Sequence, residues 1–274
     1  MYKVRTVLGN NAILVLDDSD SRETIFIGTG IGFGRKVGMT IDIAGKNVTR
    51  YVQEKGKDIS AQLIKNDSVY LEIADKLITS AASKFENFDR NILIPLSDHI
   101  AFAISRMDSG LVINNPFKND IKLLFKEEFD VAMESVSIIK EKLNKTINED
   151  EVSYITLHLH SARSDMKVDQ SLILATLVNE SLSEIEKTLD IKIDVNSLSY
   201  SRLLTHLKYL LLRCNMNEKL RIDMSDYTKT KFPVSYKLAE NVIKKFSKML
   251  KVSIDEIEVG YLALHIERIC STND

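Results

Sequence analysis

The strongest constraint on this chain is an internal repeat with an offset of 107 residues. Residues 96–106 read LSDHIAFAISR, and residues 203–213 read LLTHLKYLLLR. Aligning the two stretches places His206 on His99, with apolar residues following both. A repeat of this length is too long for a solenoid unit and has the size of a globular domain. We therefore expect two copies of one domain.

The same offset carries a second histidine and an arginine. The segment SYITLHL falls on GYLALHI, which aligns His158 with His265, and Arg106 falls on Arg213. Within each copy the two histidines are 59 residues apart, and four of the five histidines of the chain occupy these duplicated positions. Such agreement predicts one shared histidine site inside each copy.

The repeat and the composition together predict a multidomain chain of 274 residues. We expect a small antiparallel β module over residues 1–57, followed by two homologous all-α helical bundles over 63–170 and 171–274. Residues 56–62 are polar and suit a linker.

Composition excludes several classes of protein. The net charge is −2 and charged residues make up 28% of the chain, which is typical of an ordinary globular surface and gives no sign of a bulk nucleic-acid footprint. Cys214 and Cys270 form no disulfide framework, and the N-terminus MYKVRTVLGN lacks the apolar core of a signal peptide. The apolar runs are shorter than the roughly 20 residues that span a bilayer. We expect a cytoplasmic protein.

The N-terminal segment is predicted to be β structure. Residues 1–55 hold seven of the ten glycines, and TVLGNNAILVL reads as strand, turn and strand, with TIFIG and MTIDI as further strands. So small a module buries little apolar surface by itself, and pairing with a second copy is one remedy. We therefore expect a homodimer.

The run GTGIGFGRKVG at residues 28–38 has two interpretations. It is not a dinucleotide fingerprint, because Phe33 stands where that motif needs its third glycine. One interpretation is a glycine-rich hairpin with a core phenylalanine and a solvated basic pair. The other is a ligand surface, in which Phe33 stacks on a base while Arg35 and Lys36 contact phosphates.

Almost everything after residue 62 has helical periodicity. The spacing of Tyr70, Ile73, Leu77 and Ala81 predicts one such helix. Pro95 to Asp98 predicts a helix start, with Ile100, Phe102 and Ile104 as the apolar stripe and His99 in the first turn.

Two chemistries suit a duplicated histidine pair. Metal binding is the weaker one, because we find no cysteine cluster and no acidic residue repeated beside the pairs. Phosphoryl acceptance is the stronger one, because a neutral imidazole is a good nucleophile near pH 7. Asp98 adjoins His99 and is placed to orient it, although Thr205 occupies the matching position, and Arg106 or Arg213 would bind the phosphate. No cofactor, metal ion or catalytic residue is expected.

The motifs resemble a known family over the full length of the chain. GNNAILVL and IGTGIGFGRKVG are similar to the RNA-binding module of the BglG/SacY transcriptional antiterminators. DHIAFAI and LHLHSA are similar to the first phosphotransferase-system regulation domain of that family, and THLKYLLLR and YLALHIERI to the second. The combination of DHIAFAI, INNPF and LHLHSA is similar to the glucose-type members.

The resemblance implies a regulator that is not an enzyme. A dimer would bind a hairpin of the leader mRNA and prevent an overlapping terminator from forming. The RNA-binding residues implied are Asn10, Asn11, Gly28, Gly30, Phe33, Arg35 and Lys36.

The resemblance also implies control by phosphorylation. His99 and His158 would be modified by the sugar-specific permease, enzyme II, and His206 and His265 by the phosphocarrier HPr. His160, which has Glu267 as its counterpart, is interpreted as structural or auxiliary.

The chain departs from the family pattern at Gly9, where an asparagine is usual, and at Thr29 and Thr6, where a basic residue is common. Losing a phosphate contact is expected to reduce RNA affinity. Two alternatives stay open: a DNA-binding activator with the same regulatory domains, which would need a helix-turn-helix, and a metal- or ligand-sensing dimer.

Overall fold

The computed structural model describes residues 1–20, 22–53, 67–164, 166–195, 197–216, 218 and 220–271. These form two compact units, one of residues 1–115 and 127–168 and the other of residues 116–126 and 169–274. The linker predicted at 56–62 lies outside the described residues. The domain boundaries proposed at 57, 63 and 170 stay predictions.

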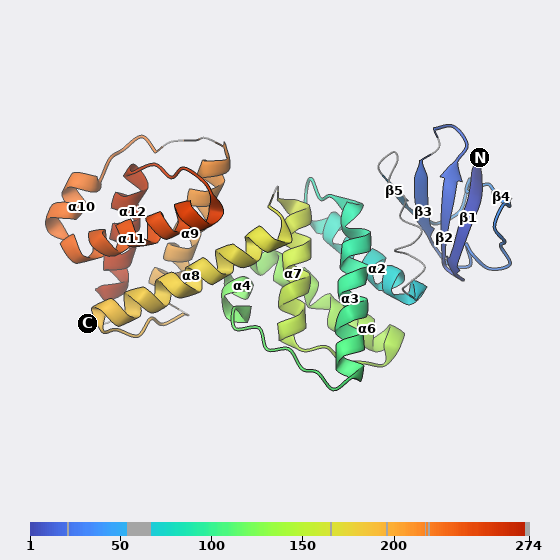
Figure 1. The fold of residues 1–274 in the computed structure, drawn as a ribbon, viewed down its shortest axis with the longest axis horizontal. Coiled ribbons are helices and arrows are strands. Elements are labelled where there is room, and N and C mark those ends of the chain that lie inside the picture. Colours follow the sequence, from blue (N-terminus) through green and yellow to red (C-terminus); the bar gives the residue numbers. More distant parts are fainter. Residues whose placement is uncertain are drawn as a thin grey trace. The chain divides into compact units, whose positions relative to one another are not determined.

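The first unit begins with a five-stranded antiparallel sheet (Figure 1). Its strands are β1 (Tyr2–Gly9), β2 (Ala12–Asp17), β3 (Glu23–Ile27), β4 (Thr40–Ile41) and β5 (Thr49–Val52). They lie in the order β4-β1-β2-β3-β5. The predicted antiparallel β module is confirmed, and β5 is a strand that the sequence pattern did not single out.

Both faces of this sheet are buried within the chain. Successive strand residues point to opposite faces, and the face of Ile13 and Phe26 is covered by the segment between β3 and β5. The opposite face, which carries Leu14 and Ile25, shares its apolar core with helix α2 (Ser68–Lys84). Because α2 supplies the missing burial, the small size of the module does not by itself require a second copy. The homodimer stays a prediction.

Helices complete the first unit. After α2 they are the 3₁₀ helix η1 (Arg90–Ile92), α3 (Leu93–Asp108), α5 (Lys126–Ala132), α6 (Glu134–Leu143) and α7 (Glu149–Arg163). In α2, the predicted stripe of Ile73, Leu77 and Ala81 is buried. Helix α3 packs against both α2 and α7. The helical character predicted for the first copy is confirmed.

Helix α3 begins earlier than the sequence predicts. Its first residue is Leu93, so Pro95 lies inside the first turn. The backbone N–H groups of a first turn have no partner within the helix, so the missing N–H of proline costs no hydrogen bond there. The prediction that His99 lies in the first turn is wrong, because His99 falls in the second turn. Phe102 was predicted in the buried stripe, but 63% of it is exposed, while Ile100 is buried.

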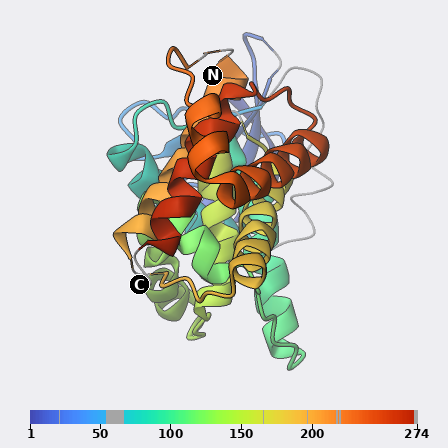
Figure 2. The ribbon, with the colours of Figure 1, turned by 90° about the vertical axis from the view of Figure 1, so that its left-hand side faces the viewer.

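The second unit is helical. Its helices are α4 (Lys118–Leu124), α8 (Val168–Leu189), α9 (Leu198–Met216), α10 (Ser225–Lys231), α11 (Pro233–Leu250) and α12 (Ile257–Cys270). Helix α12 packs against α9, α10 and α11, all drawn in orange to red in Figure 2. Buried Asp120 of α4 accepts hydrogen bonds from Asn179 of α8, at 3.0 Å, and Tyr200 of α9, at 3.3 Å. These bonds connect α4 to the second copy.

Candidate functional site

The first histidine site lies between α3 and α7. The rings of His99 and His158 have centroids 5.2 Å apart, and the Tyr154 ring lies 6.0 Å from that of His99. The Glu151 carboxylate lies 3.7 Å from His99 Nε2 and accepts a hydrogen bond of 2.7 Å from Arg106. His99 and Arg106 therefore meet at one buried carboxylate, and the second predicted histidine, His158, lies beside the His99 ring.

The second site repeats these parts between α9 and α12. The His206 and His265 rings lie 4.7 Å apart, and the Tyr261 ring is 6.4 Å from that of His206. Glu258 Oε2 lies 3.5 Å from His206 Nε2. Arg213 hydrogen-bonds both Glu258 oxygens, at 2.7 and 2.8 Å. Both copies thus pair two imidazoles with one glutamate and one arginine.

The two sites differ in how the arginine is held. Arg106 donates only to Oε1 of Glu151, and buried Oε2 has no hydrogen-bond partner among the described residues. The Arg106 guanidinium instead lies over the exposed Phe102 ring, 4.3 Å from its centroid. A bidentate pair such as that of Arg213 is stronger and more rigid than a single hydrogen bond. The first arginine is therefore the easier one to redirect.

Burial keeps the four histidines neutral. It lowers the pKa of His99, His158 and His265 to about 4, and that of His206 to about 3. The neighbouring His265 and Arg213 also lower the pKa of His206. At pH 7 each imidazole therefore has a free lone pair, as a phosphoryl acceptor requires.

The carboxylates of both sites were missed in the sequence. The side chain of Asp98, which was expected to orient His99, is exposed, and its role stays a prediction; Glu151 supplies the carboxylate beside His99 Nε2. Contrary to expectation, an acidic residue is repeated beside the pairs, because Glu151 and Glu258 share one position in the repeat. The signal was present: Glu151 lies two helical turns before His158 and therefore on the same face of α7.

A metal ion does not suit these carboxylates. No group of three or more histidine, cysteine, aspartate or glutamate side chains in the described part of the chain is arranged to hold one. Each site glutamate is hydrogen-bonded to an arginine, Glu151 to Arg106 and Glu258 to Arg213, so a cation would have to displace a guanidinium.

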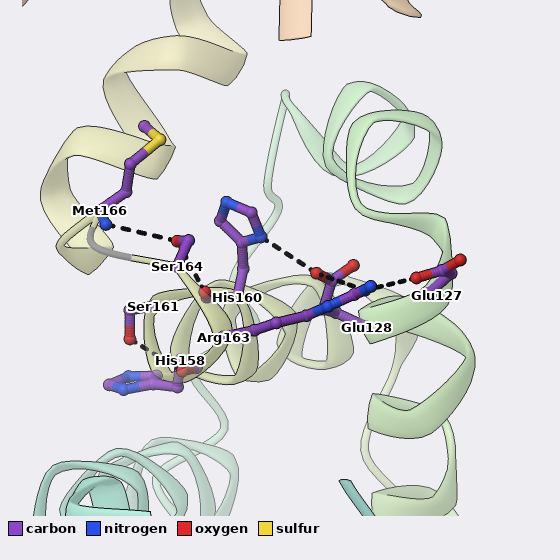
Figure 3. Close-up of polar contacts among 8 residues, drawn as sticks. All are labelled: Glu127, Glu128, His158, His160, Ser161, Arg163, Ser164 and Met166. Carbon is purple, nitrogen blue, oxygen red and sulfur yellow. Dashed lines mark hydrogen bonds and ion pairs between the residues drawn. The ribbon is translucent and has the colours of Figure 1, made fainter. Parts of the chain in front are cut away.

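His160 lies on another side of α7 from His158, as Figure 3 shows. Its Nδ1 lies 3.1 Å from Oε1 of buried Glu128, which also accepts a hydrogen bond of 3.2 Å from Arg163. Arg163 forms a second ion pair with Glu127. These contacts connect α5 to the end of α7, which agrees with the structural interpretation of His160.

A second candidate site lies on the β module, where the turn after β1 and the loop after β3 are joined. The N–H of Gly28 donates to the carbonyl of Asn11, at 2.9 Å, and the N–H of Gly32 to that of Asn10, at 3.0 Å. The side-chain oxygen of Asn11 accepts from the N–H of Gly30, at 2.8 Å. The predicted residues of these two segments therefore lie together, and their contact with RNA stays a prediction.

Two glycines of this site lie close to neighbouring atoms. A Cβ on Gly32, which the sequence analysis did not single out, would lie 2.0 Å from the carbonyl oxygen of Gly9. A Cβ on Gly9 would lie 2.0 Å from the hydroxyl of Ser68 in α2. A side chain at position 9 would therefore require the Ser68 side chain to move.

The exposed end of the loop carries the aromatic and basic residues. Phe33 is 75% exposed, which rules out the interpretation of this ring as a core residue. Lys36 is also exposed, and Arg35 is half-buried. An exposed ring next to cationic side chains is the arrangement that single-stranded RNA bases and phosphates use.

Comparisons with known proteins agree with this division of the chain. Residues 2–58 match the CAT RNA binding domain, and residues 75–162 and 179–269 match the PRD domain. No helix in the described ranges combines the length and the apolar character needed to cross a membrane.

The relatives are similar over their whole length. The GlcA/glcB genes antiterminator of Staphylococcus carnosus is 29% identical, covering 100% of this chain and 97% of that protein. Protein GlcT of Staphylococcus haemolyticus is 30% identical, covering 97% and 95%. The crystal structure of GlcT CAT-PRDI is similar with a TM-score of 0.51 and 31% identity, and the match covers 60% of this chain and 98% of that one.

The matched domains are RNA-binding and regulatory modules and not enzymes. Because a CAT domain precedes two PRD domains and the similarity to glucose-type antiterminators runs along the whole chain, this protein belongs to the BglG/SacY family of transcriptional antiterminators, in its glucose-type branch.

Proposed function

We propose that this protein is an RNA-binding antiterminator of a glucose phosphotransferase operon. It binds a hairpin of the leader transcript and so prevents the overlapping terminator from forming. The observation that carries the proposal is the surface of the CAT module where the exposed Phe33 and Lys36 lie at the end of a loop that is hydrogen-bonded to Asn10 and Asn11. The ring stacks on an unpaired base, and Lys36 with Arg35 neutralises phosphates.

Phosphorylation of the two histidine sites controls this activity. His99 and His158 accept phosphate from the sugar-specific permease, enzyme II, and His206 and His265 accept it from HPr. In each transfer an imidazole nitrogen bonds to phosphorus as the bond between phosphorus and the donor breaks. Support comes from the neutral state that burial imposes on all four rings.

The glutamate–arginine pairs convert phosphate into a change of contacts. A phosphoryl group on His99 adds negative charge beside Glu151, which it repels, and beside Arg106, which it attracts. Arg106 has a single hydrogen bond to exchange, whereas Arg213 has two. Phosphorylation therefore redirects the first arginine more readily than the second.

The active form is a homodimer located in the cytoplasm, where the transcript and the phosphoryl donors are found. Support for a protein contact comes from exposed apolar side chains on α3 and the loop after it, where Phe102, Leu111 and Val112 are 63%, 61% and 83% exposed. Exposed apolar groups of this kind favour association.

Reconstituted phosphotransfer tests the control. The full chain is incubated with phosphoenolpyruvate, the general phosphotransfer enzyme and HPr, with and without the sugar permease domain, and is analysed at neutral pH by mass spectrometry. We expect acid-labile phosphate on His206 and His265 with HPr alone, and on His99 and His158 only when the permease domain is added. Absence of phosphate from all four residues would refute phosphorylation control.

An operon reporter tests the separate roles of the two copies. We expect His99→Ala to give expression without sugar, because the inactivating phosphate has lost its acceptor, and His206→Ala to remain sugar-dependent. Equal behaviour of the two variants contradicts separate roles. Fluorescence anisotropy tests the RNA function itself: it measures the binding of the full chain to leader hairpins over a series of salt concentrations.

A further inference from the structure

The side chain of Asn11 connects the RNA-binding loop to the first PRD domain. Its Oδ1 accepts a hydrogen bond from the N–H of Gly30, at 2.8 Å, and its Nδ2 donates to Oε1 of Glu72 in α2, at 3.1 Å. The other carboxylate oxygen of Glu72 accepts from Lys142 of α6, at 2.7 Å. The loop after β3 and helix α2 therefore meet at one amide, and α6 is joined to them through the Glu72 carboxylate.

Glu72 is held firmly enough to act as an anchor. Its side chain is 15% exposed, and its neighbours Leu71 and Ile73 belong to the core that α2 shares with the sheet. One turn further along α2, Asp75 accepts a hydrogen bond of 2.7 Å from Tyr51 of β5. The position of the Glu72 carboxylate relative to the sheet is therefore set by contacts on both sides.

The amide of Asn11 is oriented by these two partners. An asparagine side chain has one accepting oxygen and one donating nitrogen. The Glu72 carboxylate can only accept, so it selects the orientation in which Nδ2 faces α2 and Oδ1 faces the loop. Gly30, with φ of +69°, lies at the bend that this oxygen holds.

We infer that Glu72 is a positioning residue for RNA binding: it orients Asn11, and Asn11 in turn holds the Gly30 bend so that Phe33 and the basic residues face the hairpin. The inference rests on the proposed RNA function and adds to it a residue from outside the CAT module. It makes the RNA surface a product of two domains.

The sign of the effect separates this inference from simple electrostatics. Removing a carboxylate near a surface that binds a polyanion strengthens binding when only charge matters. Loss of a positioning contact weakens it. We expect Glu72→Ala to reduce the affinity of the full chain for its leader hairpin roughly tenfold, the loss that one hydrogen bond to a charged group produces.

Glu141→Ala is the matched control. Glu141 lies on α6, is 67% exposed and pairs with Lys76 of α2, so its removal changes the charge equally on the same pair of helices without touching the sheet. We expect its affinity to stay within about twofold of the wild type. Glu72→Gln keeps an accepting oxygen toward Asn11 and should retain most of the affinity.

A reversal of polarity tests the contact itself. Asn11→Asp sets two carboxylates against each other and should weaken RNA binding, whereas Asn11→Asp combined with Glu72→Gln restores one donor and one acceptor. Compared with Asn11→Asp alone, we expect the double variant to bind RNA more tightly. Its Gly30 amide, measured without RNA, should also exchange its hydrogen more slowly than in Asn11→Asp.

Each result decides the inference. Affinity in Glu72→Ala equal to or above that of the wild type overturns it, and so does a double variant whose Gly30 amide, measured without RNA, exchanges as fast as in Asn11→Asp. A wild-type chain that prefers no leader hairpin refutes the proposed function and the inference with it, whereas failure of the variants alone refutes only the inference.

Discussion

Acid should destabilise the second histidine site, and His206 allows the size of the effect to be calculated. Burial, together with His265 and Arg213, lowers the pKa of His206 from 6.5 to about 3, and its side chain is 8% exposed. His206 therefore becomes protonated near pH 6.5 in the unfolded chain, but only near pH 3 in the folded chain. The contribution of His206 is complete above pH 6.5 and is lost as the pH falls toward 3.

pH 5 lies about 1.5 units below the pKa of His206 in the unfolded chain, and each unit is worth about 1.4 kcal/mol. The free energy of unfolding at pH 5 should therefore be lower by about 2 kcal/mol than at neutral pH. His206→Gln removes the titrating group and should remove that part of the fall. Ser201→Ala, at an exposed position of the same helix, should leave the fall unchanged.

Amide hydrogen exchange of α9 at pH 7 and pH 5, corrected for intrinsic exchange rates, measures both quantities. The His206 ring resonances should also stay constant from pH 8 to pH 5. A midpoint near pH 6.5 for His206, or equal losses of stability in the wild type and in His206→Gln, refutes the reasoning.

Three further outcomes are expected. Gly32→Ala should lower hairpin affinity at least tenfold in anisotropy titrations, because its Cβ meets the Gly9 carbonyl oxygen at 2.0 Å; unchanged affinity contradicts the close approach. Phe33→Ala should weaken RNA binding by about 1–3 kcal/mol with an unchanged circular dichroism spectrum, and a loss of fold would show that the ring is structural. Glu258→Gln should lower the free energy of unfolding of the second unit by about 3 kcal/mol in urea titrations, because Arg213, whose side chain is only 16% exposed, loses its countercharge; a change below about 1 kcal/mol contradicts this.

The repeat allowed much of the histidine sites to be predicted. Four histidines and two arginines at matching positions had to lie in matching places, and the structure brings them together in pairs. The glutamates were given no role, because the sequence offers Asp98 as the carboxylate nearest to His99 in the chain. Asp98 directly precedes His99, but neighbouring helix residues point about 100° apart. Glu151 reaches His99 from another helix.

The β module was predictable in its strands and less so in its surroundings. Alternating apolar residues and glycine-rich turns define β1 to β3. Nothing local indicates that α2 covers one face of the sheet, because α2 has the same apolar stripe that packs its own bundle. For the same reason the hydrogen bond between Asn11 and Glu72 could not be predicted, because these residues become neighbours only when the chain folds.

The shared core of the sheet and α2 has a consequence during synthesis. A chain emerges from the ribosome from its N-terminus, so all five strands are made before Ser68, where α2 begins. Until α2 has followed, Leu14 and Ile25 lack the cover that the finished fold gives them. The nascent sheet should therefore become fully packed only when the first helix of the regulatory domain has been synthesised. The antiterminator would then gain its RNA-binding surface only after synthesis of its regulatory domain has begun.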